Sequence, residues 1–324
     1  MGERTGIEWA DHTFNPWWGC EKVSPACANC YAEGMAARFG TEWGPNVPRR
    51  LMGDDYWKGP LSWDRKAKAA GVKRRVFCAS MADVFEDRED LSDARARLWQ
   101  LIEKTPNLVW MLLTKRPENV HHLIPGTWRV KMPGNVWMGV TVEDQERADE
   151  RIPRLLKIKA GVRFLSCEPL LGPLDFDKLP IPGTGCKISA LRGIYGVPGQ
   201  WHAESQAIHW VICGGESDPK GQARPMNPAW AQGLRRDCEA AGVPFFFKQW
   251  GEWAPLDVAK RLGLVSGIGG GLVTHQGLQV KEFDLKDVGR ADRCKVGTTM
   301  WRIGAKKTGS LLDGVDHKAI PVMS

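Results

Sequence analysis

The run Val76-Phe77-Cys78-Ala79-Ser80 is short and apolar, as expected of a buried β-strand. After ten further residues comes the segment from Leu91 to Glu103, in which apolar residues recur at three- and four-residue steps. These apolar residues are Leu91, Ala94, Leu98, Leu101 and Ile102. Because this spacing places them on one face of a helix, the two segments together predict one β–α unit.

The same alternation recurs along most of the chain. The predicted strands are an extended segment before Cys20, Val76–Ser80, Leu108–Leu113, Val136–Val142, Val162–Cys167, Ile208–Cys213 and Val243–Phe247. The predicted helices include Tyr31–Phe39, Leu91–Glu103, Asp144–Lys157 and Pro228–Ala241. Alternating strands and helices favour a parallel sheet with right-handed crossovers. No Gly-x-Gly-x-x-Gly follows the first strand, so we predict an α/β fold that is a complete or partial (β/α) TIM-like barrel rather than a dinucleotide-binding sheet.

Two segments break this pattern and predict the domain organisation. Residues 173–206 are rich in Gly and Pro and follow the fifth strand, so we expect an insertion that forms a lid, a binding element or a disordered loop. We therefore predict a barrel over residues 1–253 that contains this insertion. Residues 254–324 are expected to form a C-terminal extension that caps or covers the barrel.

The composition sets broad limits on function. Of the 324 residues, 43% are hydrophobic and 26% are charged, which excludes disordered and collagen-like proteins. No apolar run approaches the roughly 18 residues of a membrane span, and the N-terminus lacks the apolar segment of a secretory signal, so we expect a cytoplasmic protein without membrane contact. The net charge of +7 is compatible with a polyanionic partner. Most of the sixteen Trp are expected in the core, although exposed ones could stack on bases.

Three cysteines, Cys20, Cys27 and Cys30, form a C-x6-C-x2-C cluster after the first predicted strand. One short loop thus brings three thiolates within reach of a metal centre and offers no fourth cysteine. Iron–sulfur clusters are held mostly by four thiolates, so a cluster with three would keep one iron open for a small ligand. Catalytic zinc sites also keep an open position. The cluster therefore predicts a metal site with a chemical role.

Other interpretations of the cysteines remain open at this point. A structural zinc ion could recruit His12 or a distant cysteine as its fourth ligand. A disulfide is disfavoured, because nine cysteines is an odd number and a chain of this length does not need stapling. The remaining cysteines lie mostly in apolar runs and are expected to be structural; they are Cys78, Cys167, Cys186, Cys213, Cys238 and Cys294.

Polar side chains follow every predicted strand after the first. They are Ser80 and Asp83, Thr114-Lys115-Arg116, Thr141 and Glu143, Ser166 and Glu168, Gly214-Gly215-Glu216, and Lys248-Gln249-Trp250. In (β/α) barrels the active site lies at the carboxyl ends of the strands. Because the cysteine cluster follows the first strand, we expect all these groups to share one rim with the metal site.

Several short blocks, in this order, carry a family resemblance. They are Asn15-Pro16-Trp17-Trp18-Gly19-Cys20, Ser24-Pro25-Ala26-Cys27, Cys30-Tyr31-Ala32-Glu33, Leu113-Thr114-Lys115-Arg116-Pro117, Gly139-Val140-Thr141-Val142-Glu143, Glu168-Pro169-Leu170-Leu171-Gly172-Pro173, Gly214-Gly215-Glu216-Ser217 and Leu311-Leu312-Asp313-Gly314. Together they resemble a phage- and prophage-encoded three-Cys-motif family of uncharacterised function. The resemblance covers most of the chain and implies no known reaction.

The cysteine loop also resembles the radical S-adenosylmethionine superfamily. That resemblance implies a [4Fe–4S] cluster whose open iron binds the amino and carboxylate groups of S-adenosylmethionine. The superfamily typically shows C-x3-C-x2-C with an aromatic residue before the last cysteine, whereas this chain has a longer first gap and Asn29 before Cys30. The Gly-Gly-Glu motif of the superfamily follows the second strand, whereas Gly214–Glu216 follows the sixth strand here. We therefore assign no cofactor-binding role to Gly214–Glu216 from this resemblance. The Cys30-Tyr31 pair resembles the spore-photoproduct-lyase branch, which repairs DNA lesions.

The superfamily resemblance gives the polar rim residues expected roles. Glu143 and Glu168 would hold the ribose hydroxyls or the amino group of the cofactor, and Ser80 and Ser166 would position its carboxylate. The basic residues Lys115, Arg116 and Lys248 would face phosphate or carboxylate groups of the substrate. Alternatively, Lys115 and Arg116 form ion pairs with Glu143 or Glu168 that brace the barrel mouth.

The expected function is therefore radical chemistry by an iron–sulfur enzyme that takes electrons from an external donor. The charge, the tryptophans and the resemblances favour a nucleic acid or nucleotide as substrate, in DNA modification or repair. A small metabolite or a partner protein is the competing substrate. A zinc-braced barrel that binds nucleic acid without catalysis is the alternative function.

Overall fold

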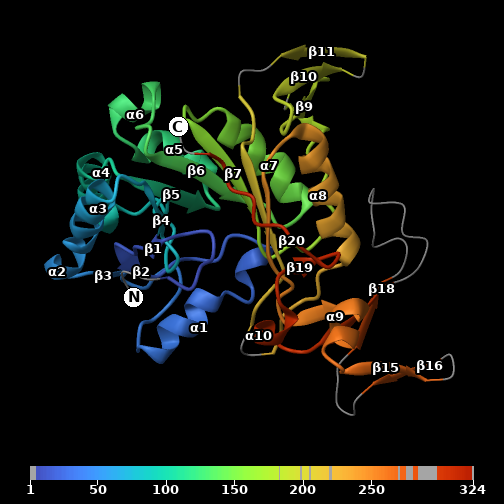
Figure 1. Ribbon diagram of the computed structural model, residues 1–324. Coiled ribbons are helices and arrows are strands. Elements are labelled where there is room, and N and C mark those ends of the chain that lie inside the picture. The colour runs from blue at the N-terminus through green and yellow to red at the C-terminus, as the bar shows by residue number, and fades with distance from the viewer. Residues whose placement is uncertain are drawn as a thin grey trace.

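A seven-stranded parallel sheet forms the centre of the computed structural model (Figure 1). The structure describes residues 5–322 except 182, 198, 204–205, 219–220, 269–270, 275–279 and 284–297. In order across the sheet the strands are β1 (His12–Thr13), β4 (Arg74–Cys78), β5 (Leu108–Thr114), β6 (Val136–Thr141), β7 (Val162–Cys167), β12 (Trp210–Gly214) and β13 (Phe245–Gln249). β1 and β13 are the two edge strands of this sheet and do not pair with each other. The sheet therefore curls without closing, which makes it a partial TIM-like barrel. The predicted fold class is confirmed, with a strand at each of the seven expected places.

Helices cover one face of this sheet (Figure 1). The longest are α3 (Gly59–Ala69), α4 (Ser92–Lys104), α7 (Gln145–Leu156) and α8 (Pro228–Ala241). Helix starts follow the local sequence: the Asp144 side chain accepts from the Arg147 N–H at the start of α7, and the Asn227 side chain accepts from the Ala229 N–H at the start of α8. The shorter helices are α1 (Tyr31–Arg38), α2 (Asp54–Trp57), α5 (Val120–Leu123), α6 (Gly126–Val130), α9 (Leu256–Arg261) and α10 (Ala305–Thr308). None of the helices that the structure describes has the length and apolarity needed to cross a membrane.

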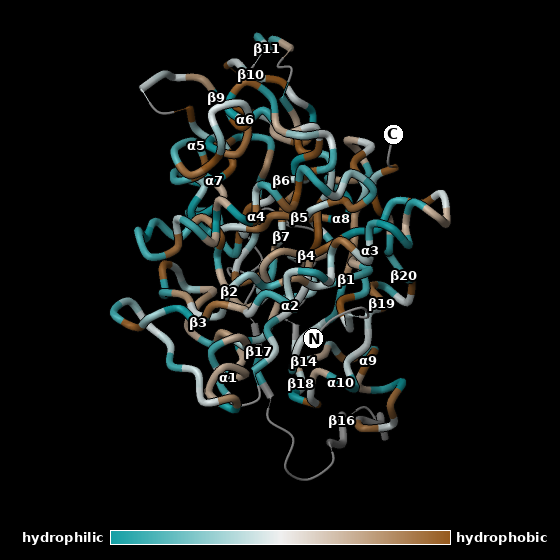
Figure 2. The backbone as a smooth tube through the Cα atoms, turned by 90° about the vertical axis from the view of Figure 1, so that its left-hand side faces the viewer, coloured by the Kyte–Doolittle hydropathy of each residue, from teal (hydrophilic) through white to brown (hydrophobic). Residues whose placement is uncertain are grey.

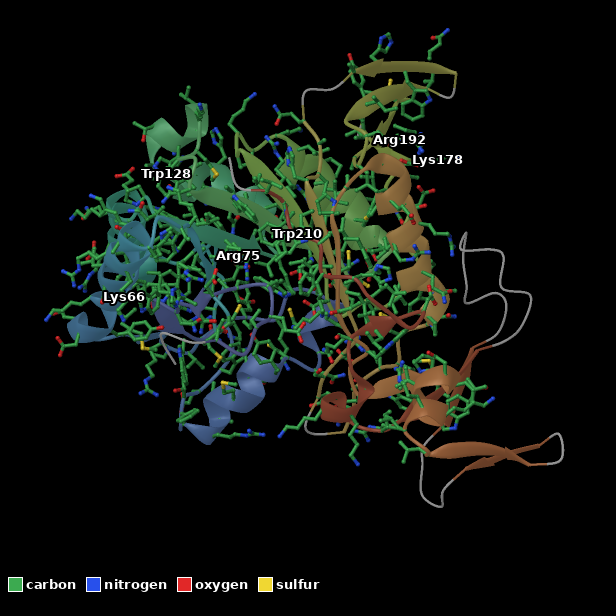
Figure 3. The ribbon with its side chains drawn as sticks, viewed as in Figure 1. Lys66, Arg75, Trp128, Lys178, Arg192 and Trp210 are labelled. Carbon is green, nitrogen blue, oxygen red and sulfur yellow. The ribbon has the colours of Figure 1, made fainter. Side chains whose placement is uncertain are left out.

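The opposite face of the sheet is filled by aromatic side chains rather than by helices. Its buried core is made of Trp9, Phe77, Val109, Met111, Trp137, Phe164, Trp210, Ile212 and Phe246. Trp210 lies at the centre, with its ring 5.9 Å from that of Phe164 (Figure 3). Gly139 leaves room for Phe164, because a Cβ at residue 139 would lie 2.4 Å from its ring. All but two of the sixteen tryptophans, Trp43 and Trp201, are buried, so core packing accounts for their abundance.

The insertion after β7 contains a small antiparallel sheet. Its strands are β8 (Leu179–Pro180), β9 (Lys187–Ser189), β10 (Ile194–Val197) and β11 (Gln200–Ala203). These strands could not be predicted from the sequence, because segments of two to four residues are too short to show an alternating pattern.

The C-terminal residues form further small sheets and then return to the barrel. The strands are β14 (Trp253–Pro255), β15 (Val265–Ile268), β16 (Gly271–Thr274), β17 (Val280–Phe283), β18 (Thr298–Arg302), β19 (Leu311–Leu312) and β20 (Val315–Asp316). Near the end, the Phe247 N–H donates to the His317 carbonyl at 2.8 Å, and Trp210 Nε1 donates to the Ala319 carbonyl at 2.9 Å. The residues coloured as hydrophobic in Figure 2 gather around the central strands. The domain boundaries proposed from the sequence remain predictions.

Candidate metal and cofactor site

The three cysteines lie in one loop, Gly19–Cys30, here called the cysteine loop. It follows the short strand β2 (Trp17–Trp18), which pairs with β3 (Arg50–Leu51), and it ends at Cys30, the residue before α1. Gly19 adopts φ +118°, and a Cβ there would lie 2.7 Å from Arg49 Cδ. Glycine is therefore required where the chain turns into the loop.

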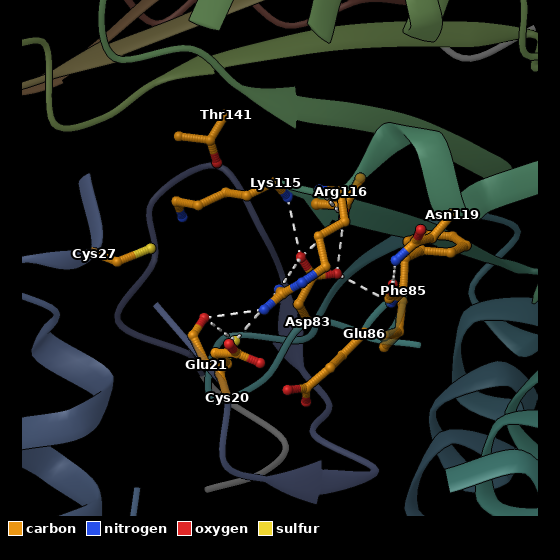
Figure 4. A network of polar contacts seen from close by, with 12 residues as sticks. Cys20, Glu21, Cys27, Asp83, Phe85, Glu86, Lys115, Arg116, Asn119 and Thr141 are labelled. Atoms are coloured by element: carbon orange, nitrogen blue, oxygen red, sulfur yellow. Dashed lines mark hydrogen bonds and ion pairs between the residues drawn. The ribbon is translucent and has the colours of Figure 1, made fainter. Parts of the chain in front are cut away.

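The first side chain that holds the loop is Arg116, directly after β5. Its Nη1 donates to Cys20 Sγ at 3.6 Å and to Asp83 Oδ2 at 3.1 Å, and its Nη2 donates to the Glu21 carbonyl at 3.0 Å (Figure 4). Asp83 follows β4 and also accepts from Thr114 Oγ1 at 2.8 Å. Because β4 and β5 are neighbours, the register of the sheet brings this acid and base together under the start of the loop.

The second anchor is Glu143, which follows β6 and is fully buried. One carboxylate oxygen accepts from the Ala26 N–H at 3.2 Å, and the other accepts from Arg151 Nη1 on α7 at 3.0 Å. Both oxygens are thus used within the protein. Glu143 fixes the residue immediately before Cys27.

The third anchor is Glu216, which follows β12. Its Oε2 accepts from Asn29 Nδ2 at 3.0 Å and from the Arg224 N–H at 2.7 Å, and Arg224 Nη2 pairs with its Oε1. The same Arg224 Nη2 donates to the Pro25 carbonyl at 3.0 Å. Three arginine–carboxylate pairs, from three places on the carboxyl-end rim, therefore hold the cysteine loop. Charge-assisted hydrogen bonds of this kind are stronger than neutral ones.

The loop thiols have different electrostatic surroundings. Burial and the nearby Asp83 charge raise the pKa of Cys20 to about 11, and Arg116 offsets part of this rise. Burial also opposes ionisation of Cys27, but the charge of Lys115 and hydrogen bonds from Val23 and Ser24 outweigh it, so the pKa of Cys27 is lowered. Lys115 extends toward Cys27 in Figure 4. A basic group thus faces each of these two thiols.

The three cysteine side chains of the loop are donors of the kind that iron–sulfur clusters use. All three loop cysteines are free thiols. Within the described residues, no group of three or more His, Cys, Asp or Glu side chains is close enough to hold a single metal ion. His12, considered above as a zinc ligand, stacks on Trp63 with ring centroids 4.4 Å apart.

The other cysteines lie away from this chemistry, as expected. Cys78, Cys167, Cys213 and Cys238 are buried in the core between the sheet and the helices, and Cys186 lies just before β9 in the insertion. Burial raises the pKa of Cys167 and of Cys213, so both stay protonated. Cys294 lies outside the described residues.

The other predicted rim residues differ in their burial and in their polar contacts. Ser80 Oγ accepts from Asn15 Nδ2 at 3.1 Å, and the Ser80 carbonyl accepts from the Tyr31 hydroxyl at 2.9 Å. Ser166 is almost fully buried, paired in register with Thr141 on β6. Lys248 Nζ forms an ion pair with Glu168 Oε1 at 3.0 Å, and both side chains keep some exposure to solvent.

The suggested bracing pairs differ from those observed. The alternative role of Lys115 and Arg116 is an ion pair with Glu143 or Glu168, but Arg116 pairs with Asp83. Glu143 instead pairs with Arg151, and Glu168 with Lys248. Glu143 pairs with Arg151 because α7, which carries Arg151, belongs to the same β–α unit. The proposed cofactor and substrate contacts of these residues remain predictions.

Sequence reasoning missed Arg151 and Arg224. Arg151 could have been recognised from the sequence. It is a charged residue on the otherwise apolar face of α7 that contains Ala148, Ile152 and Leu155. Arg224 could not have been recognised, since its contact with Pro25 joins residues 199 positions apart.

Comparisons with solved structures find spore photoproduct lyases at low similarity. A double mutant with bound AdoMet and dinucleoside spore photoproduct has TM-score 0.40 and 11% identity, over 93% of this chain and 73% of that chain. A single mutant has TM-score 0.38 and 13% identity, over 52% of this chain and 48% of that one. The lyase complexed with dinucleoside spore photoproduct has TM-score 0.37 and 14% identity, over 52% and 51%. This chain thus spans about half the length of the last two.

Curated protein sequences give no match to this chain. A family model does match, over residues 4–321, which is nearly the whole sequence. The chain belongs to the family described as "Protein of unknown function (DUF5131)".

Proposed function

We propose that this protein is an iron–sulfur enzyme of the radical S-adenosylmethionine type. The observation that carries the proposal is the cysteine loop, with three free thiols held on the carboxyl-end rim of a partial barrel. Three thiolates leave one position of a four-iron cluster open, and the rim is where barrel enzymes hold their substrates. When bound, such a cluster supplies the electron that cleaves the sulfonium of S-adenosylmethionine, with an external donor as its source.

The chain's own residues would bind and orient the two ligands. Cys20, Cys27 and Cys30 would hold the cluster. Ser80, Ser166 and Glu168 are proposed to contact S-adenosylmethionine, and Glu168 is the best supported because its carboxylate retains some exposure beside Lys248. The sequence predicts the same role for Glu143. Its contacts with Ala26 and Arg151 better support a role in fixing the loop.

The proposed substrate is a nucleic acid or a nucleotide. Lys115 and Lys248 lie at the ends of β5 and β13 and could face phosphate groups, and the chain carries a net charge of +7. Arg116 supports this role less well, since it is buried against Asp83 and Cys20.

Metal analysis of the anaerobically purified chain tests the proposal. We expect a brown protein with about four iron and four sulfide per chain. The variants Cys27→Ala and Cys30→Ala should lose both. Cys186→Ala is the matched control, because Cys186 is a partly exposed free thiol in the insertion, and it should keep both. A colourless protein with one tightly held zinc would overturn the proposal in favour of a zinc-braced, nucleic-acid-binding barrel.

A further inference from the structure

Arg116 is an unusual basic residue for this rim, because its guanidinium is buried and faces a sulfur atom. The residue is 7% exposed. Its donors go to Cys20 Sγ, to the Asp83 carboxylate and to the Glu21 carbonyl. A residue with these contacts is placed to act on the cysteine rather than on a ligand in solvent.

The position of Arg116 is fixed independently of the cysteine. Asp83 accepts from Thr114 Oγ1 at 2.8 Å and from the Lys115 N–H at 3.0 Å, so the carboxylate is set by the ends of two paired strands. Arg116 is then held by Asp83 at 3.1 Å. The contacts that hold Arg116 to Asp83 and to the strand ends therefore do not involve the cysteine.

The other two arginines at the loop make different contacts. Arg151 donates to the Thr141 carbonyl and to Glu143, and Arg224 donates to the Pro25 carbonyl and to Glu216. These acceptors are all oxygen atoms. Arg116 is therefore distinguished from Arg151 and Arg224 by its described contact with sulfur, which gives a matched comparison inside one site.

We propose that Arg116 is a positioning residue that sets the reduction potential of the metal centre held by Cys20. This inference rests on the proposed function. Hydrogen bonds to cluster sulfurs and nearby charge both tune the potentials of iron–sulfur centres. The N–H···S bond and the positive charge favour the reduced cluster, which carries one more electron. Arg116 thus raises the potential, and Asp83 limits the rise by neutralising part of its charge.

The test is a potentiometric titration of the anaerobically reconstituted full-length chain, followed by electron paramagnetic resonance. Arg116→Gln should shift the midpoint potential to a more negative value. Arg116→Lys keeps the charge but loses the planar donor set, so a smaller shift in the same direction is expected. Asp83→Asn leaves the arginine charge uncompensated and should shift the potential to a more positive value.

Arg151→Gln is the control for loop anchoring. It should lower the iron content while leaving the potential of the remaining clusters unchanged. An unchanged potential in Arg116→Gln at wild-type iron content contradicts the inference. So does loss of iron in all three variants of Arg116 and Asp83, which would assign the pair to loop anchoring alone. A wild-type chain that takes up no iron overturns the proposed function itself.

Discussion

The Ala26 N–H donates to Glu143 Oε1 at 3.2 Å, so a carboxylate at the end of β6 holds the residue before Cys27. The second oxygen of the same carboxylate accepts from Arg151 Nη1 at 3.0 Å. The side chains of both charged residues are almost completely buried. The position of the cysteine loop therefore depends on a charge pair that water does not screen.

Glu143→Gln should destabilise the metal-free chain. The change leaves the Arg151 charge buried without its partner, which typically costs about 3–5 kcal/mol of unfolding free energy. Denaturant titration of the metal-free chain measures this cost. Arg154→Ala is the matched control, because the Arg154–Glu150 pair is exposed and its loss should cost less than about 1 kcal/mol. Equal effects of the two changes would contradict the anchoring role.

The strands of the central sheet were predictable from the sequence, but the anchors of the loop were not. Continuous apolar runs such as Leu108–Leu113 are specified locally, so each predicted strand is present. The partner of Arg116 depends on the register of β5 against β4, which brings up Asp83 instead of Glu143 or Glu168. Side chains that meet only in the folded state leave no local pattern. The contact between Arg224 and Pro25 is of this kind.

Gly139→Ala should destabilise the barrel through its aromatic core. The new Cβ would lie 2.4 Å from the Phe164 ring, which itself packs on Trp210. Overpacking of this kind costs about 1–3 kcal/mol. Denaturant titration should show that loss, and the smaller side chain in Gly139→Ala/Phe164→Leu should restore part of it. No gain in the double variant would show that the glycine serves another purpose.

Stability should fall in mildly acidic solution because of His209. Burial and the nearby Arg163 charge lower the pKa of His209, and its Nδ1 accepts from the Arg163 N–H at 3.1 Å. The unfolded chain therefore binds this proton at a higher pH than the folded chain. The stabilisation is complete above about pH 6.5 and is lost as the pH falls through the lowered pKa. Thermal melting between pH 5 and 8 should show a weaker dependence in His209→Gln, and identical pH profiles would refute the assignment.

Two glutamates on the rim should respond differently to substitution. The reduced chain is expected to release 5′-deoxyadenosine from S-adenosylmethionine even without substrate, because this cleavage requires only the cluster and the bound cofactor. Glu168→Gln should weaken S-adenosylmethionine binding at unchanged iron content, since Glu168 pairs with the partly exposed Lys248. Glu143→Gln should instead lower the iron content, since Glu143 holds the loop. Calorimetric binding and iron analysis of both variants separate the two roles. Lower iron content in Glu168→Gln together with weaker cofactor binding in Glu143→Gln would contradict both assignments.

Binding to DNA should depend on salt through the lysines at the rim. Each phosphate contact contributes roughly −0.9 to the slope of log K against log salt for duplex DNA. The double change Lys115→Gln/Lys248→Gln should therefore make the slope shallower by about 2, if both side chains contact phosphates. The matched control is Lys68→Gln/Lys104→Gln, which removes two exposed charges where α3 and α4 end, near the amino ends of β4 and β5. It lowers the net charge equally but should leave the slope nearly unchanged. Equal slopes for the two double variants would mean that net charge alone drives binding, and no affinity at low salt for single-stranded or duplex DNA would rule out a nucleic-acid substrate.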